Sequence, residues 1–68
     1  DERLVWVRRS FETLPEKQRT ALQLRDIEGH SYQEVATAMD ISESDVKVTL
    51  HRARQALKDK LSHLRFHL

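Results

Sequence analysis

The sequence predicts an all-α domain of four helices that ends in a helix-turn-helix motif. Apolar residues recur at spacings of three and four, the single Pro and the single Gly stand where helices begin and end, and no alternating apolar run with turn residues predicts a strand. We expect helices at about 2–13, 15–28, 31–39 and 43–63. Sixty-eight residues suffice for one domain, 1–68, and the abrupt start within a helical pattern indicates a fragment of a longer chain.

The first two predicted helices are defined by an apolar stripe and by two helix-boundary residues. Leu4, Val7, Phe11 and Leu14 follow one another at helical spacing, which predicts an amphipathic first helix. Pro15 suits the first turn of the second helix, and Gly29 suits the left-handed position just past its end. The second helix is apolar on two sides, which predicts that it is either central or half exposed for a partner; the apolar residues concerned are Ala21, Leu22, Leu24 and Ile27.

The last two predicted helices each begin with a serine that resembles the first residue of a capping box. Ser31 is followed three residues later by Glu34, and Ser42 by Asp45, the weaker partner of the two. A short helix, a turn of residues 40–42 and a long helix match the helix-turn-helix motif, which we place at 31–62. The inward residues are Val35, Ala36 and Met39 in the short helix and Val46, Leu50, Ala53, Leu57, Leu61 and Leu64 in the long one.

Charge is distributed unevenly along the chain. Residues 1–46 contain six Lys/Arg and ten Asp/Glu, whereas residues 47–68 contain six Lys/Arg and one Asp. This asymmetry has two interpretations. It is either a charge dipole that orients the domain on a polyanion, or simply a basic helix exposed to solvent. Because the chain has no cysteine, no signal peptide and no apolar run of about 18–20 residues, we expect a cytoplasmic protein that binds no membrane.

The outer face of the long helix carries side chains that could contact bases in the major groove of DNA. In helix-turn-helix proteins the N-terminal part of the second helix enters the major groove of DNA. Lys and Arg pair with guanine, Ser with several base edges, and an apolar group contacts the thymine methyl. Val48 is therefore interpreted as a base reader, although one exposed valine is ordinary on any surface. The predicted base-reading residues are Ser44, Lys47, Val48, His51 and Arg52.

A second group of side chains is predicted to contact phosphates. Arg54 and Lys58 lie along the flank of the long helix, where cations position DNA without reading its sequence. Ser31 and Tyr32 stand at the N-terminus of the third helix, whose backbone N–H groups and hydroxyls suit a phosphate. Partial burial under the first helix is the alternative interpretation of Tyr32.

Three segments together resemble domain 4 of the bacterial extracytoplasmic-function sigma factors. They are LPEKQR at the second helix, LRDIEGHSYQEVA leading into the motif, and VKVTLHRAR in the predicted recognition helix. The likeness covers residues 14–58. It implies a domain that binds the promoter −35 element while the sigma factor directs core RNA polymerase, whose β-subunit flap would dock on the apolar concave side. Anti-sigma factors often occupy the same surfaces in that family, and the five base-reading residues match positions that meet DNA.

The sequence departs from the family pattern at the turn and in the recognition helix. Asp40 stands where Gly is usual, and Asp tolerates the left-handed conformation better than most residues. Val48 and Thr49 stand where Ser-Arg is frequent, which implies one cation fewer and a changed −35 preference.

Other functions are less consistent with the sequence. Without a Gly-rich phosphate loop, a Cys nucleophile or a plausible Ser/His/Asp set, we expect no enzymatic activity and no cofactor. His63 and His67 are spaced to share a metal on a helix, but a third ligand is missing, so we expect no metal site. Two alternatives remain: the DNA-binding output domain of a two-component regulator, which usually dimerises, and a sigma-like module that binds only an anti-sigma protein. The sigma interpretation predicts a monomer.

Overall fold

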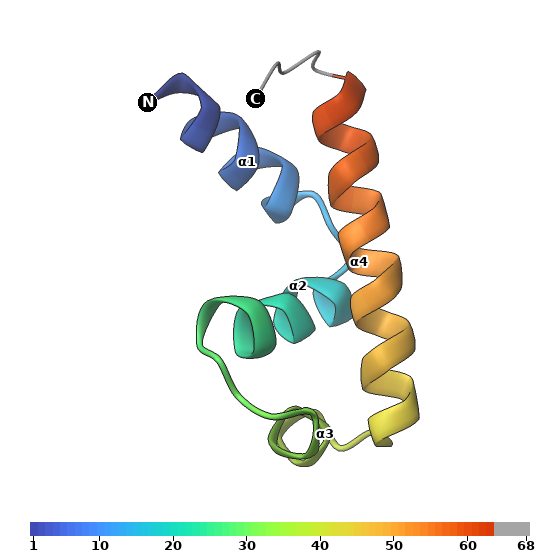
Figure 1. Ribbon diagram of the computed structural model, residues 1–68. Helices are drawn as coiled ribbons and strands as arrows, with labels where there is room; N and C mark the ends of the chain where they lie inside the picture. Colours follow the sequence, from blue (N-terminus) through green and yellow to red (C-terminus); the bar gives the residue numbers. More distant parts are fainter. Residues whose placement is uncertain (64–68) are drawn as a thin grey trace.

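The computed structural model describes residues 1–63, and within them every regular element is a helix. The elements are α1 (Glu2–Glu12), α2 (Glu16–Leu22), the π-helical turn η1 (Gln23–Ile27), α3 (Tyr32–Met39) and α4 (Glu43–His63). The long α4 is the spine of the molecule: α2 and α3 lie beside its N-terminal half, and α1 lies toward its C-terminal half (Figure 1). The all-α prediction is confirmed. Leu64 and His67 lie outside the described residues.

The helix boundaries follow local signals in the sequence. Ser31 and Glu34 form the complete predicted capping box, with Ser31 itself the N-cap of α3. Gly29 has a φ of 78° and Asp40 a φ of 55°, so both take the left-handed conformation that ends a helix. Pro15 is the N-cap of α2 because its backbone is extended, so the helix begins at Glu16, one residue after the predicted start.

The predicted continuous helix 15–28 is divided into two parts. After Leu22 the chain forms a π-turn, in which the N–H of Glu28 donates to the carbonyl of Gln23 at 3.0 Å. The N–H of His30 then donates to the carbonyl of Leu24 at 3.0 Å and closes the turn beyond Gly29. Ala21 and Leu22, before the turn, are buried, whereas the wider turn changes the direction of the side chains that follow and Ile27 is 64% exposed.

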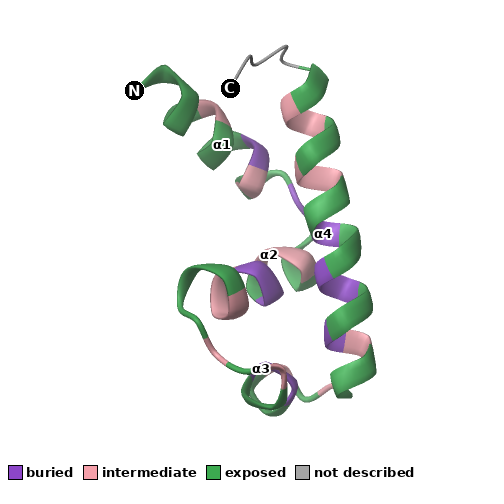
Figure 2. Cartoon of the chain, viewed as in Figure 1, coloured by how far each residue is buried: buried purple, intermediate pink, exposed green. Residues whose placement is uncertain are grey.

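The core lies between α2, α3 and the N-terminal half of α4 (Figure 2). Its largest fully buried side chains are Val35, Val46 and Leu50. Small residues at Ala21, Ala36 and Ala53 allow the helices to approach one another closely. Val46, Leu50 and Ala53 confirm the predicted inward stripe of α4, whereas Leu57 and Leu61 are only half-buried because fewer elements cover that end of the helix.

The apolar stripe of α1 is mostly uncovered. Leu4 is 67% exposed and Val7 is 38% exposed, whereas Ser10 on another side of α1 is buried. The helix is therefore amphipathic as predicted, but its apolar face contacts the core only near Phe11 and the following Leu14. This difference decides where the domain has apolar surface to offer a partner.

Candidate nucleic-acid interface

The N-terminal half of α4 presents its outer face to solvent. Ser42, the second of the two predicted capping serines, precedes the helix and accepts a hydrogen bond from the N–H of Asp45 at 3.0 Å. Val48 is 45% exposed, at the centre of this face. All five predicted base-reading side chains are exposed: Ser44, Lys47, Val48, His51 and Arg52.

Thr49 does not belong to the outer face. Its side chain is buried and its hydroxyl donates to the Asp45 carboxylate at 3.0 Å. The departure from Ser-Arg therefore changes the outer face at Val48 alone, because position 49 points toward the body of the domain.

Asp45 connects the start of α4 to α2. Its carboxylate accepts two hydrogen bonds from Lys17, at 2.9 and 3.0 Å, besides the one from Thr49. The hydrogen bonds from Lys17 and Thr49 hold the pKa of Asp45 below its ordinary value. Ser42 thus forms only half of a capping box, since the Asp45 side chain is directed to α2 instead of back to Ser42.

Tyr32 lies between two cations at the junction of η1, α3 and α4. The Arg25 guanidinium lies 4.6 Å from the centre of the Tyr32 ring, and the Lys47 ammonium lies 5.6 Å from it. Tyr32 is half-buried against the core, but under Arg25 of η1 and not under α1 as the alternative interpretation held. The ring therefore restrains Lys47, one of the base-reading candidates.

Ser31 is largely engaged within its own helix. Its hydroxyl accepts from the N–H of Glu34 at 3.0 Å, and its own N–H donates to the Glu34 carboxylate at 2.8 Å. The latter bond holds the pKa of Glu34 below its ordinary value, so a carboxylate already occupies this helix N-terminus. The hydroxyl proton is the donor that Ser31 retains for a phosphate.

The two flanking cations of α4 differ in their surroundings. Arg54 forms a two-pronged ion pair with Asp26 of η1, with Nη2–Oδ1 at 2.7 Å and Nε–Oδ2 at 3.0 Å. Lys58 is exposed and forms no ion pair within residues 1–63. Sequence reasoning identified neither Asp26 nor Arg25 as part of this region, because their directions depend on the π-turn and no sequence periodicity indicates one.

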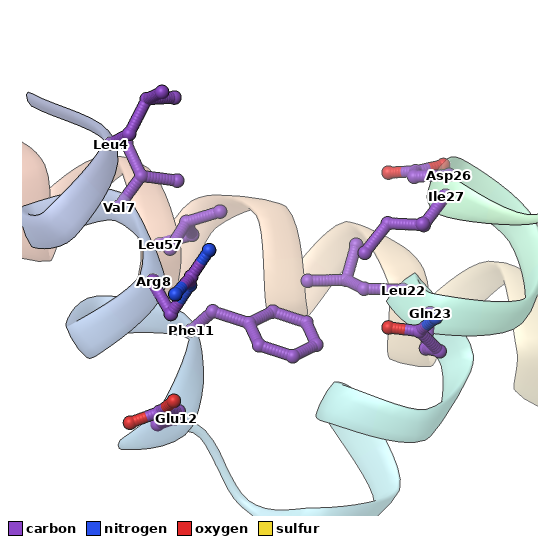
Figure 3. A pocket seen from close by; sticks show the side chains of 10 residues that line it. All are labelled: Leu4, Val7, Arg8, Phe11, Glu12, Leu22, Gln23, Asp26, Ile27 and Leu57. Carbon is purple, nitrogen blue, oxygen red and sulfur yellow. The ribbon is translucent and has the colours of Figure 1, made fainter. Parts of the chain in front are cut away.

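An apolar groove opens between α1, α2, η1 and α4, and none of the five predicted base-reading residues lines it (Figure 3). Leu4 and Val7 come from α1, Leu57 from α4, and Leu22 and Ile27 from the opposite wall. Arg8, Glu12 and Asp26 stand among the other lining residues, so charged groups border the apolar floor. An exposed apolar surface with a polar rim is typical of a protein-binding site.

The described part of the chain has no group of three or more His, Cys, Asp or Glu side chains placed to hold a metal ion. His67, the partner considered for His63, lies outside that part. None of the described helices is long and apolar enough to cross a membrane.

Comparison with known proteins assigns the chain to one protein family. The model of sigma-70, region 4, matches residues 4–57. The chain is 41% identical over 56 residues to the ECF RNA polymerase sigma-E factor of Escherichia coli, covering 82% of this chain and 29% of that protein. It is also 41% identical over 64 residues to the RNA polymerase sigma-H factor of Pseudomonas aeruginosa, covering 94% of this chain and 33% of that protein.

The chain thus spans about a third of the length of these relatives. The family match includes α1, the core helices and the exposed face of α4 down to Leu57. With its all-α fold, capped helix-turn-helix and basic recognition helix, the chain belongs to the sigma-70 region 4 family.

Proposed function

We propose that this domain binds the promoter −35 element as part of a sigma factor that directs RNA polymerase to initiate transcription. The observation that carries the proposal is the exposed outer face of α4, whose side chains suit the major groove. Both relatives described above are named sigma factors, which favours this function over a two-component regulator. On this proposal the protein is not an enzyme, and it works in the cytoplasm, where RNA polymerase acts.

Each outer residue has a distinct proposed role. Arg52 and Lys47 donate to guanine O6/N7 or to a neighbouring phosphate, and Ser44 and His51 contact base edges. Val48 packs against a thymine methyl, because its exposed branched side chain offers no hydrogen bond. A restrained Lys47, held near the Tyr32 ring, loses less freedom on binding than a fully mobile lysine.

Phosphate contacts complete the proposed interface. Lys58 is exposed along the flank of α4, Ser31 is exposed at the N-cap of α3, and the half-buried Tyr32 follows it. Sequence reasoning added Arg54 to this group, but its ion pair with Asp26 leaves it fewer free donors. If four to six phosphates are neutralised, the logarithm of the binding constant falls with the logarithm of salt concentration with a slope of roughly −4 to −5.

The apolar groove is the proposed contact with polymerase. A short apolar segment of the β-subunit flap would cover Leu4, Val7 and Ile27, which are otherwise exposed. An anti-sigma factor would compete for the same groove. Because the body of the domain is acidic, the isolated domain binds DNA weakly, and attachment to polymerase supplies the effective concentration. On this proposal the domain itself is a monomer.

The decisive experiment is a DNA titration at several salt concentrations. Duplexes selected from a random library by the wild-type chain serve as ligands, and Lys47→Ala and Arg52→Ala are compared with Lys60→Ala. Lys60 is a cation of the same helix that borders Trp6 and Arg9 at the other end of the domain. We expect both interface variants to weaken binding by about 1 to 3 kcal/mol while Lys60→Ala stays near wild type. Unchanged affinity in both interface variants would exclude DNA binding by this face.

A module that binds only an anti-sigma protein is the second possibility. It predicts that the cations of α4 are dispensable for every ligand, because the apolar groove would be the only functional surface. The same titration separates the two, since such a module shows no sequence-dependent affinity for any duplex.

A further inference from the structure

Two ion pairs join the first half of the domain to the recognition helix. Lys17 of α2 holds Asp45 in the first turn of α4, and Asp26 of η1 holds Arg54 nine positions further along the helix. Nine residues correspond to about 13 Å of helix. The pairs therefore act at two separate points on the rod that carries the proposed base-reading residues.

The Arg54 pair is the more directional of the two. A guanidinium that donates two parallel hydrogen bonds to one carboxylate fixes the relative plane of both groups, whereas an ammonium behaves as a point charge. Arg54 achieves this geometry with donor–acceptor distances of 2.7 and 3.0 Å. Each group is thereby restrained by the other across the η1–α4 contact.

The Arg54–Asp26 pair lies where the apolar packing of α4 becomes less complete. The fully buried stripe of α4 ends at Ala53, and Leu57 and Leu61 are only half-buried. Beyond Ala53 no residue of α4 is fully buried, so apolar packing restrains the second half of the helix less than the first. Arg54 directly follows the last buried residue, so its directional bond to Asp26 lies where the apolar restraint on α4 decreases.

Asp26 is itself held in place by the π-turn. The N–H of Glu28 donates to the carbonyl of Gln23 at 3.0 Å, and the guanidinium of Arg25 donates to the carbonyl of His30 at 2.8 Å. The hydrogen bond from Arg54 holds the pKa of Asp26 below its ordinary value, and the carboxylate is ionised at neutral pH. The acceptor that Arg54 meets is therefore both fixed and charged.

We propose that Arg54 is a positioning residue, and that its bond to Asp26 sets the rotation at which α4 presents its outer face to the major groove. The inference rests on the proposed function, because it assumes that this face reads DNA. It replaces the phosphate contact expected of Arg54: a paired Arg54 and Asp26 bring no net charge to the interface, so the pair adds nothing to the salt dependence of binding.

The test compares Asp26→Asn, Arg54→Lys, Arg54→Ala and the double variant Asp26→Asn/Arg54→Ala in titrations with the selected duplex and with a scrambled one. Asp26→Asn gives the sharpest result, because it removes an anion near a polyanion. Positioning predicts that it weakens specific binding on the order of threefold to tenfold and lowers the ratio of specific to scrambled affinity. A phosphate-binding Arg54 predicts the opposite, since Asp26→Asn frees the guanidinium; higher or unchanged affinity overturns the proposal.

Arg54→Lys separates geometry from charge. Lysine retains the cation but not the two-pronged bond, so positioning predicts a loss of the specific-to-scrambled ratio close to that of Arg54→Ala, with the salt slope unchanged. Near-wild-type binding by Arg54→Lys, or a slope reduced by about 1 in the double variant, which removes both charges of the pair, indicates a phosphate contact and overturns the proposal. The double variant is expected to lose no more affinity for the selected duplex than either single variant. A loss equal to the sum of the two single losses overturns the proposal as well.

Two controls keep the inference separate from the proposed function. Lys47→Ala and Arg52→Ala report DNA reading without touching the pair, so a failure in both tells against the function itself. If both matter while Asp26→Asn binds as well as wild type, the positioning inference alone fails. The helix content of each variant, measured by circular dichroism under the titration conditions, verifies that the comparison is between folded proteins.

Discussion

Helices α1 and α4 carry apolar stripes of the same period, but the domain covers only one of them. Val46, Leu50 and Ala53 on α4 are at most 1% exposed, whereas Leu4 on α1 is 67% exposed. The reason is tertiary: α2 and α3 both pack on the N-terminal half of α4, while α1 meets only the other half. Periodicity therefore identifies an apolar face, but the neighbours determine whether that face forms core or surface.

The same comparison separates two kinds of interaction. The covered stripe of α4 holds a helix whose opposite face is polar and cationic, which suits a polyanion. The uncovered stripe of α1 lines a groove with Leu22 and Ile27, which suits an apolar segment of another protein. The domain therefore presents two distinct surfaces. One is the polar outer face of α4, whose inner face is buried, and the other is the apolar groove beside α1.

The largest effect is expected from truncating matched leucines on the two stripes. Leu50→Ala removes a fully buried side chain and is expected to lower the free energy of unfolding by about 2 to 5 kcal/mol. Leu4→Ala is expected to change it by less than about 0.5 kcal/mol, because Leu4 is already exposed to water. Urea unfolding followed by circular dichroism measures both values. Equal destabilisation would mean that α1 belongs to the core and that the contrast is wrong.

A smaller effect is expected at the start of the helix-turn-helix. Ser31→Ala removes the hydroxyl that accepts from the N–H of Glu34, one of the two hydrogen bonds of the capping box, and is expected to cost about 1 kcal/mol of unfolding free energy. Ser62→Ala is the matched control, since Ser62 is exposed near the end of α4. Thermal unfolding of the two variants gives the comparison, and identical midpoints would rule out a stabilising cap at Ser31.

The ion pair of Asp26 predicts a pH-dependent difference between wild type and Asp26→Asn. The folded-state pKa of Asp26 is lowered from its ordinary value of 3.8, so the ionised carboxylate stabilises the fold above that pH and the benefit is lost as the pH falls through the lowered pKa. Since Asp26 and Arg54 are 39% and 47% exposed, water screens the pair and the difference is at most about 1 kcal/mol. Urea unfolding at neutral pH and near pH 2 measures it. A difference that stays constant over that range would exclude the carboxylate charge as its source.

The smallest effect is expected at Val48. Replacing each thymine of the selected duplex by uracil removes one methyl, and loss of a buried methyl costs at most about 0.8 kcal/mol, or roughly fourfold in affinity. One position is expected to show this loss with wild type and not with Val48→Ala. If no position responds, Val48 is simply an exposed valine, and the sequence preference comes from the polar residues around it.

Local signals predicted much of this molecule, and contacts distant in sequence supplied the rest. Ser31 with Glu34, Gly29, and the left-handed Asp40 depend on a few neighbouring residues, so the pattern alone indicated them. The pairs of Lys17 with Asp45 and Asp26 with Arg54 each join residues 28 positions apart, and they form only once the helices cross.

The candidate interface shows the same division. The outer face of α4 followed directly from a rotation of 100° per residue, and its members are all exposed. The roles of the flanking residues did not follow, because the π-turn that directs Asp26 toward Arg54 has no sequence signature of its own. Arg54 therefore looked like a free cation in the sequence and is a bonded one in the fold.

The most direct test of the two-surface account is to follow the backbone amide resonances of the chain while the selected duplex is added at low salt. The account predicts that the shifts concentrate on residues 44–52 of α4 and at the start of α3, while Leu4, Val7 and the rest of the groove remain unchanged. Shifts confined to α1 and the groove, or none with any duplex, would contradict the claim that the outer face of α4 reads DNA.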